Sequence, residues 1–482
     1  MNTPIQVTNI QAYRQQLYAS FEYRADAQME LIDALLSNTS AQSVVSLSLS
    51  PFFRRHYSSV SDAIAAACHH CLVARGAARR TREQQLVRLL KPYLPAPQQR
   101  RFWLLTHDAT AWPRRFARTV RDVGYVYQPN TLRGNTPVTI GHQYDALVLL
   151  PEKPHPHAPP WVVPLTLRRI TTQETETQVA AEMLNAVLTD TALPFQHDLT
   201  VDVADSKHSV VAFLGRVYPN PNLVVITRSR GNRVYYRPYV ADSPAQRAPG
   251  APKHYGVRFA LREADTWGAP DEVLRTPYTS RRGRAYTVVI EAWASLIMKG
   301  KRDCPMWDKP FTLVRIRMLD DTGKAVFRRS LWLVVMGTRR SELQLHEIWQ
   351  AYRQRYDIEH FFRFGKQRLL FAHYPTPETE HQENWAQLTQ LAYTQLWLLR
   401  DLVNVLPRPW EQYLPRVEEA DATPSQTQRD AARILRQIGT PARAPKPRGK
   451  SPGRPRGAEV PHRPRVKVVK KSTKRAKSRQ TA

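Results

Sequence analysis

The spacing of apolar residues divides the chain into segments with different periodicities. Over residues 10–94 the pattern is helical, because apolar residues recur in short repeats with few turn-forming residues between them. The stretch SDAIAAACHHCLVARGAARR has the small-residue composition of a packed helix and ends in a basic cluster, Arg75, Arg79 and Arg80. We therefore predict a helical domain over residues 1–98. It is either a DNA-reading module with arginines at one end or a helical cap.

Short apolar runs typical of strands begin at Phe102. RFWLLTH, HQYDALVLLP, LTVDVADS and NLVVITRSR are strand candidates, and TQETETQVAAEMLNAVLTD, between the second and third, has a helical period. Strands interspersed with helix predict an α/β core. Strands predominate over residues 232–340, which we predict to be a β-rich insertion. Helices resume at Ser341, so the α/β domain is expected to span residues 99–406, followed by a helical extension over residues 407–440.

The last 42 residues, 441–482, differ in composition from the rest of the chain. They hold 15 Lys and Arg against one Glu, with Pro and Ser but almost no aromatic residues. Such a segment cannot bury enough apolar surface to fold alone, so we predict a disordered basic tail. Its net charge is +14, and subtracting this from the +30 of the whole chain leaves +16 for the body.

The charge of the whole chain indicates a polyanionic partner. Its 71 Lys and Arg against 41 Asp and Glu give a pI of about 10.4, and nucleic acid is the usual partner of such a protein. No apolar run reaches the ~18 residues that a bilayer span needs, and the N-terminus lacks the basic and apolar regions of a signal peptide. Three Cys cannot form a disulfide framework, which fits a reducing compartment. We therefore expect a cytoplasmic protein that binds nucleic acid and no membrane.

The stretch SELQLHEIWQAYRQRYDIEHFFRFGKQRLLF is predicted to be one helix, with Ser341 as its N-cap. On a helical wheel, four polar residues share a stripe roughly 60° wide and about 21 Å long. They are Tyr352, Arg355, Glu359 and Lys366. The stripe borders the apolar face of the helix. This position suits a carboxylate at the edge of the core, with cations on both sides that bind phosphates.

A simpler interpretation of the same stretch remains open. Arg355 and Glu359 stand at i and i+4, where an ordinary intrahelical ion pair forms on many amphipathic helices. Gly365 is a point at which a bend in the helix is expected.

The spaced quartet Tyr352-x2-Arg355-x3-Glu359-x6-Lys366 resembles the Tyr-Arg-Glu-Lys pattern of a group of bacterial insertion-sequence transposases of the DDE type. These are the insertion sequence four and seven-hundred-and-one related transposases. The resemblance covers roughly residues 102–406 and includes the strand-borne acids, the β-rich insertion and the run ITRSRGNRVYY. It implies a ribonuclease-H-like core in which Glu359 is the third metal-binding carboxylate.

Two more carboxylates are expected at strand ends. Asp108 closes the strand RFWLLTH, where the resemblance puts the first acid, and His107 beside it faces away and stays unassigned. For the second acid, TVDVADSKHS offers Asp202 and Asp205, whose side chains point to opposite faces of a regular strand. We choose Asp205, because it ends the run and precedes a turn. The alternative for each acid alone is a structural role at a strand-to-loop turn.

The resemblance also implies residues that bind DNA. Contacts to phosphates near the cut end are expected from Tyr352, Arg355 and Lys366. Three arginines after the second acid either extend this basic wall or only add solubility: Arg228, Arg230 and Arg233. In related enzymes an aromatic residue of the insertion stacks on a base flipped from the duplex. Candidates here, each also a candidate core residue, are Trp293, Trp307 and Trp332.

The sequence Cys68-His69-His70-Cys71 suggests zinc but is a poor site. A structural zinc ion usually takes two separated ligand pairs, and four consecutive helical residues point in four directions. We predict a core helix there.

Two short modules in the tail resemble AT-hooks, Lys446-Pro447-Arg448-Gly449 and Gly453-Arg454-Pro455-Arg456-Gly457. In the hook interpretation, Arg454 and Arg456 reach the floor of a narrow A·T minor groove. The alternative is an unstructured tail that binds any phosphate backbone.

Together these features predict a transposase with a ribonuclease-H-like α/β core, an N-terminal helical domain and a basic tail. Asp108, Asp205 and Glu359 are expected to hold two Mg²⁺ ions, for which Mn²⁺ substitutes. The resemblance implies a bacterial, nucleoid-associated homodimer that binds double-stranded DNA, cuts it at the element's ends and joins the 3′ ends to target DNA. The alternatives are a nuclease without strand transfer and a non-catalytic DNA-binding protein derived from a transposase.

Overall fold

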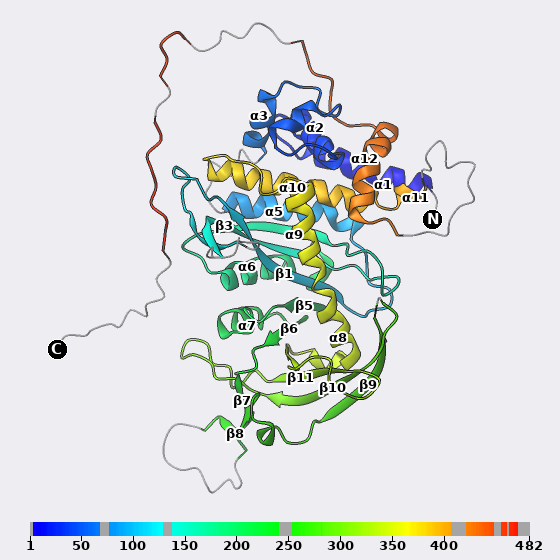
Figure 1. Ribbon diagram of the computed structural model, residues 1–482, viewed down its shortest axis with the longest axis vertical. Helices are drawn as coiled ribbons and strands as arrows, with labels where there is room; N and C mark the ends of the chain where they lie inside the picture. The colour runs from blue at the N-terminus through cyan, green and yellow to red at the C-terminus, as the bar shows by residue number, and fades with distance from the viewer. Residues whose placement is uncertain are drawn as a thin grey trace, which may run out of the picture.

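The computed structural model describes residues 3–67, 77–128, 137–240, 253–280, 282–405, 421–447, 455–459 and 462–470. Figure 1 shows a layer of helices at one end of the molecule and a long twisted sheet that runs away from it. The architecture is therefore mixed α/β, with a central sheet and flanking helices.

Within the described residues, ten strands form one sheet. The order is β2-β3-β1-β5-β6-β12-β11-β10-β9, and β4 also pairs with β3. The strands have the following bounds: β1 Trp103–Pro113, β2 Gly124–Tyr127, β3 Val138–Leu149, β4 Val163–Ile170, β5 Thr200–Ala204, β6 Leu223–Ser229, β9 Glu272–Thr279, β10 Ala285–Leu296, β11 Phe311–Leu319 and β12 Leu331–Met336. A separate two-stranded sheet contains β7 Val234–Pro238 and β8 Tyr255–Ala260.

The middle of the sheet is parallel and buried. β1 pairs in parallel with β5, and β5 pairs in parallel with β6. All five residues of β5, TVDVA, are buried, as expected for a strand covered on both faces. The edge strand β9 is largely exposed and carries charges and a proline, which discourage pairing with other chains.

The strands predicted as an insertion lengthen the same sheet. β12 pairs antiparallel with β6, with Trp332 opposite Ser229, and β11, β10 and β9 follow in order. Among the strands that the structure describes, only the β7–β8 pair forms a separate sheet.

Two helices cover the sheet beside its parallel strands. They are α6 Glu176–Leu188, which the sequence predicted, and α7 Val211–Val217, which it did not. The hydroxyl of Thr175 caps α6 by accepting a hydrogen bond from the backbone of Gln178. The seven residues of α7 are too few for a clear helical period in the sequence.

Both ends of the chain contribute to the helical layer. The bounds are α1 Thr3–Ala19, α2 Ala25–Leu36, α3 Ser58–Ala66, α5 Ala77–Leu90, α10 Thr379–Leu399, α11 Leu402–Val405 and α12 Pro424–Ile438. The buried Arg14 guanidinium donates to Asp33 in α2 at 2.8 Å and to Gln395 in α10 at 2.6 Å. Asn384 in α10 donates to the Ile64 carbonyl in α3. The N-terminal helices therefore pack directly on helices from the other end of the sequence.

The described part of the basic tail contacts the body of the protein. The backbone N–H groups of Val466 and Val469 donate to the carbonyl oxygens of Arg118 and Val123, beside the edge strand β2. Among the described helices, none is long and apolar enough to cross a membrane.

Candidate active site

Asp108 lies in the middle of β1, not at its end. The strand continues to Pro113, so the prediction that Asp108 closes it was wrong. The polar residues Thr106, His107 and Asp108 interrupt the apolar run in the sequence, but the pairing with β3 continues on both sides of them. Asp108 faces Ala146 of β3 across the ladder, and its carboxylate accepts the Ala109 N–H at 2.8 Å. The side chain is one-quarter exposed, which leaves one edge of the carboxylate open.

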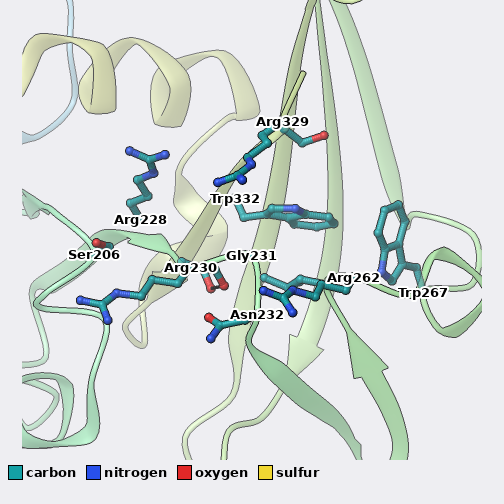
Figure 2. A pocket seen from close by; sticks show the side chains of 12 residues that line it. Ser206, Arg228, Arg230, Gly231, Asn232, Arg262, Trp267, Arg329 and Trp332 are labelled. Carbon is teal, nitrogen blue, oxygen red and sulfur yellow. Dashed lines mark hydrogen bonds between the residues drawn. The ribbon is translucent and has the colours of Figure 1, made fainter. Parts of the chain in front are cut away.

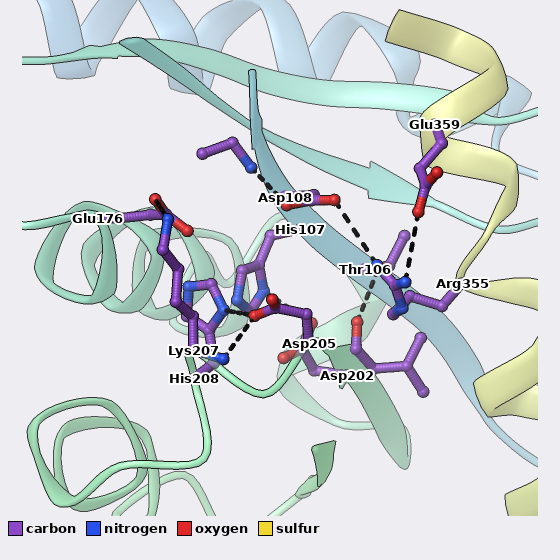
Figure 3. A network of polar contacts seen from close by, with 12 residues as sticks. Thr106, His107, Asp108, Glu176, Asp202, Asp205, Lys207, His208, Arg355 and Glu359 are labelled. Carbon is purple, nitrogen blue, oxygen red and sulfur yellow. Dashed lines mark hydrogen bonds and ion pairs between the residues drawn. The ribbon is translucent and has the colours of Figure 1, made fainter. Parts of the chain in front are cut away.

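Asp205 lies just past the end of β5, in the connection to α7. Its carboxylate is 37 % exposed and accepts hydrogen bonds from the Lys207 N–H and from Nδ1 of His208. Asp202, the alternative, is fully buried inside β5 and its carboxylate contacts His107 instead. Strand alternation predicted this separation of Asp202 from Asp205, and it also predicted that His107 faces away from Asp108 (Figure 3).

The helix with the Tyr-Arg-Glu-Lys pattern is divided into two. α8 Leu345–Gln354 and α9 Asp357–Arg368 are separated at Arg355 and Tyr356, where the backbone stays right-handed but hydrogen bonds tighten to i−3. The predicted N-cap was wrong: Gln344 caps α8, and Ser341 lies in a separate short 3-10 helix. The helix α9 continues through Gly365 to Arg368 without a break.

Arg355 lies between two of the predicted acids. Its guanidinium is 3.6 Å from Oδ2 of Asp108 and 3.4 Å from Oε1 of Glu359. Figure 3 shows Asp108 on β1 and Glu359 on α9 with the Arg355 side chain between them. The i,i+4 pair of the simpler interpretation is therefore present, and the same guanidinium also contacts an acid 247 positions earlier in the sequence.

The two strand-side acids ionise differently because their surroundings differ. Burial raises the pKa of Asp108 to about 6, against the opposing charge of Arg355. Burial would also raise the pKa of Asp205, but hydrogen bonds from His208 and Lys207 outweigh it and lower the value to about 2. The negative charge of Asp205 raises the pKa of Asp108 further. The two carboxylates therefore lie within electrostatic range of each other.

The donor chemistry of these acids fits a hard divalent cation. Carboxylate oxygens are the ligands that Mg²⁺ and Mn²⁺ prefer. In the part of the chain that the structure describes, no three His, Cys, Asp or Glu side chains are spaced to hold a metal ion. The positive charge between Asp108 and Glu359 comes from Arg355, so a divalent ion would fit these acids only after that guanidinium moves away.

The other two residues of the quartet are half-buried. Burial raises the pKa of Tyr352, whose hydroxyl is within electrostatic range of Arg355, Arg228 and Asp205. Burial lowers the pKa of Lys366, and no described acid forms an ion pair with it. Tyr352 already contacts Arg355, whose guanidinium lies 5.8 Å from the centre of its ring, while Lys366 is left without an acidic partner among the described residues.

A basic hollow of about 640 Å³ opens beside the acids. Figure 2 shows four arginines around it, which come from the end of β6, the β6–β7 connection, the segment just after β8 and the segment just before β12. They are Arg228, Arg230, Arg262 and Arg329. Ser206, the neighbour of Asp205, also lines the hollow, and none of its lining residues is acidic. No described acid forms an ion pair with any of the four guanidinium groups.

Sequence reasoning found only part of this hollow. Arg233 does not line it and donates instead to the Ser209 carbonyl. Arg262 and Arg329 were missed because nothing in the linear sequence distinguishes them from other exposed arginines.

The three tryptophan candidates have different positions. Trp293 and Trp332 are buried among aromatic side chains, although Trp332 also lines the hollow. Trp307 is exposed and stacks on His254 with ring centroids 4.0 Å apart. Trp267, which was not predicted, also lines the hollow.

Two motifs lie wholly or partly beyond what the structure covers. Cys68-His69-His70-Cys71 and Arg454 fall outside the described residues. Arg456 is described and exposed, in a short turn in which Ala458 donates to the Pro455 carbonyl.

A family of nucleases matches more than half of the chain. The family model described as DDE superfamily endonuclease matches residues 16–288. This range contains Asp108 and Asp205, while Glu359 lies beyond its end. No curated protein matches the chain.

Proposed function

Since this chain belongs to the DDE superfamily of endonucleases, we propose that it is a DNA transposase. It cuts DNA at the ends of an insertion sequence and joins the 3′ ends to target DNA. One observation carries the proposal: Asp108 and Glu359, from a strand and a distant helix, lie on two sides of Arg355, with Asp205 in electrostatic range. A nuclease that cuts without joining would share this centre.

The sheet supports a ribonuclease-H-like core. β4, β3 and β1 are antiparallel neighbours, and β5 and β6 continue the sheet parallel to β1. In this arrangement the first acid comes from the central strand β1 and the second from the adjacent β5 end.

We infer that Asp108, Asp205 and Glu359 would hold two Mg²⁺ or Mn²⁺ ions. Endonucleases of this superfamily generally use divalent metal ions. When bound, two such ions activate the attacking oxygen and stabilise the leaving oxygen of an in-line displacement. Asp205, with its pKa lowered to about 2, offers a charged carboxylate at neutral pH without competition from a proton.

Arg355 has two roles in this proposal. Without DNA its guanidinium contacts both Asp108 and Glu359 and offsets part of their negative charge. When a DNA phosphate enters, the guanidinium turns to it, since the planar fork of arginine binds phosphate bidentately. Lys366 and Tyr352 contact neighbouring phosphates as a point charge and a hydroxyl donor, and the arginine-lined hollow holds the DNA end beyond them.

The reaction proceeds in two displacements at phosphorus. In the first, a water oxygen attacks the phosphate at the element's end, and the P–O3′ bond breaks to leave a 3′ hydroxyl and a 5′ phosphate. In the second, this 3′ hydroxyl attacks a target phosphate, and one target P–O bond breaks as the new one forms. No covalent protein–DNA intermediate is needed. Both ends react together on a homodimer.

The test is cleavage of a supercoiled plasmid that carries the element's flanking ends, in Mg²⁺ and in EDTA. Glu359→Gln keeps the shape of the side chain and removes its charge, so we expect cutting to fall at least 100-fold with DNA binding retained. The matched control is Glu380→Gln, an exposed glutamate in the first turn of α10, which should cut as wild type does.

The outcomes separate the three functions. Equal cutting by wild type and Glu359→Gln would remove Glu359 from the centre. Metal-dependent cutting without a joined product would identify a nuclease, and tight binding with no cutting by either protein would identify a non-catalytic DNA-binding protein.

A further inference from the structure

The second acid is carried by a turn rather than by a strand. Asp205 follows β5, and the turn 205–208 leads on to α7. Oδ1 of Asp205 accepts both the Lys207 N–H at 2.8 Å and Nδ1 of His208 at 3.2 Å. In the described structure no group donates to Oδ2, so one carboxylate oxygen is fixed and the other faces outward.

The His208 ring is buried although its partner is not. Its side chain is 1 % exposed, against 37 % for the Asp205 carboxylate that it contacts. It packs edge-on against Phe213 of α7, with ring centroids 5.0 Å apart. A carboxylate only accepts hydrogen bonds, so Nδ1 of His208 must carry the proton.

The same ring connects the turn to the central strand. His208 meets His107 of β1 edge-to-face, with centroids 4.3 Å apart. Nδ1 of His107 lies 3.2 Å from Oδ1 of Asp202 in β5, and both side chains are fully buried. Because His107 is the chain neighbour of Asp108, a continuous set of contacts joins Asp205 to the strand that carries the first acid (Figure 3).

A second contact fixes the same turn from outside. Nζ of Lys207 donates to Oε2 of Glu176 at 2.6 Å, in the first turn of α6, and Nε2 of Gln143 in β3 donates to the same oxygen at 2.7 Å. The turn is therefore held between α6 on one side and the buried histidines on the other.

We propose that His208 is a positioning residue, which holds Asp205 through its Nδ1–H and fixes that acid relative to Asp108 through its contact with His107. This inference rests on the proposed function, since it concerns the use of Asp205 as a metal ligand. An acid on a turn rotates unless a neighbour holds it, and metal ligands tolerate only about 0.5 Å of displacement. Partners behind a ligand typically change metal affinity 10–100-fold when they are removed.

Two substitutions distinguish this role from packing, because one should lower the metal affinity and the other should lower the melting temperature. His208→Phe keeps the buried ring beside His107 and loses the donor, so Mn²⁺ affinity should fall 10–100-fold with little change in melting temperature. His208→Asn keeps a donor close to the position of Nδ1 and loses the ring, so it should melt earlier but keep most of the affinity. If His208 acted only through packing, His208→Asn would lose more Mn²⁺ affinity than His208→Phe.

The measurement is Mn²⁺ binding to the full-length protein with a short DNA duplex bound, so that a phosphate draws Arg355 away from the acids. Free Mn²⁺ is followed by electron paramagnetic resonance against the same duplex alone, and thermal unfolding of each variant is recorded. Asp205→Asn sets the level for loss of the ligand itself. Wild-type affinity in His208→Phe, or an equal loss in His208→Asn, would overturn the proposal. If wild type binds no Mn²⁺, the metal centre of the proposed function fails, and the next measurement decides the positioning role.

The histidine tautomer provides this metal-independent measurement. In protein with ¹⁵N-labelled histidine, the His208 signals, assigned by their loss in His208→Asn, should show the Nδ1–H tautomer. Asp205→Ala removes the acceptor and should convert His208 to the commoner Nε2–H form. An Nε2–H tautomer in the wild-type, metal-free protein would rule out the hydrogen bond on which the positioning role depends.

Discussion

Single buried side chains connect parts of the molecule that are distant in sequence. His142 of β3 is one of them: Nε2 lies 2.9 Å from the Arg121 carbonyl and Nδ1 lies 2.8 Å from Gln382 of α10. The ring is almost fully buried, so its protonation state affects the contact between the sheet and the helical layer.

The pH dependence of stability should report on His142. Burial first, and the charge of Arg169 second, lower its pKa below the ordinary 6.5. In the unfolded chain the imidazole regains its ordinary pKa and binds the proton more readily. Its stabilising contribution is therefore full above about pH 6.5 and is lost as the pH falls, by up to about 1.4 kcal/mol per pH unit. The free energy of unfolding measured in urea should fall more steeply between pH 6.5 and 5 for wild type than for His142→Gln. Parallel pH profiles would contradict this.

At the scale of elements, the charged groups beside the acids lie at or near the ends of helices and strands. The break between α8 and α9 falls at Arg355, so the residue that contacts both Asp108 and Glu359 sits where one helix ends. The arginine-lined hollow likewise combines the end of β6 and the β6–β7 connection with the segments just after β8 and just before β12. Strands keep these groups at fixed distances, while their ends leave the side chains free to meet a ligand.

The salt dependence of DNA binding should show the contribution of the hollow. Arg262→Gln and Arg329→Gln should each weaken binding and reduce the slope of log affinity against log salt by about one, because each removes one phosphate contact. The matched control is Arg258→Gln on β8, since Arg258 is already neutralised by Glu263. Fluorescence anisotropy between low and physiological salt measures the slopes. An equal change in all three variants would mean that only net charge matters.

At the scale of the whole molecule, the two ends of the chain build one helical layer. The buried pair of Arg14 and Asp33 is completed by Gln395, and Gln428 of α12 donates to the Leu35 carbonyl of α2. Apolar side chains of α2 pack against α10, so the first 98 residues share their core with helices some 300 positions later.

Residues 1–98 should therefore not fold as an independent domain. Without α10 and α12 their apolar faces are exposed and Arg14 loses Gln395, so circular dichroism should show weak helicity and no cooperative thermal transition. Coexpression with residues 372–447 should restore a cooperative transition. Cooperative unfolding of the 1–98 fragment alone would contradict this prediction.

Several features could be predicted from the sequence because their signals are local. The apolar runs of β5 and β6 and the helical period of α6 are properties of consecutive residues, and so is the strand alternation that separates Asp202 from Asp205. The excess of positive charge is a property of composition and needs no structure. The spaced quartet around Glu359 led to the DDE superfamily, to which the chain belongs.

Other features depend on contacts between segments that are far apart, and only the tertiary structure decides them. The length of β1 beyond Asp108 comes from pairing with β3, and the break at Arg355 accompanies its contact with a strand 247 positions earlier. Arg262 and Arg329 are ordinary exposed arginines until the sheet brings them to one hollow. The contact of His208 with His107 likewise requires β1 and β5 to be neighbours. Periodicity fixes which face of an element is apolar, but the packing of whole elements fixes which polar groups meet.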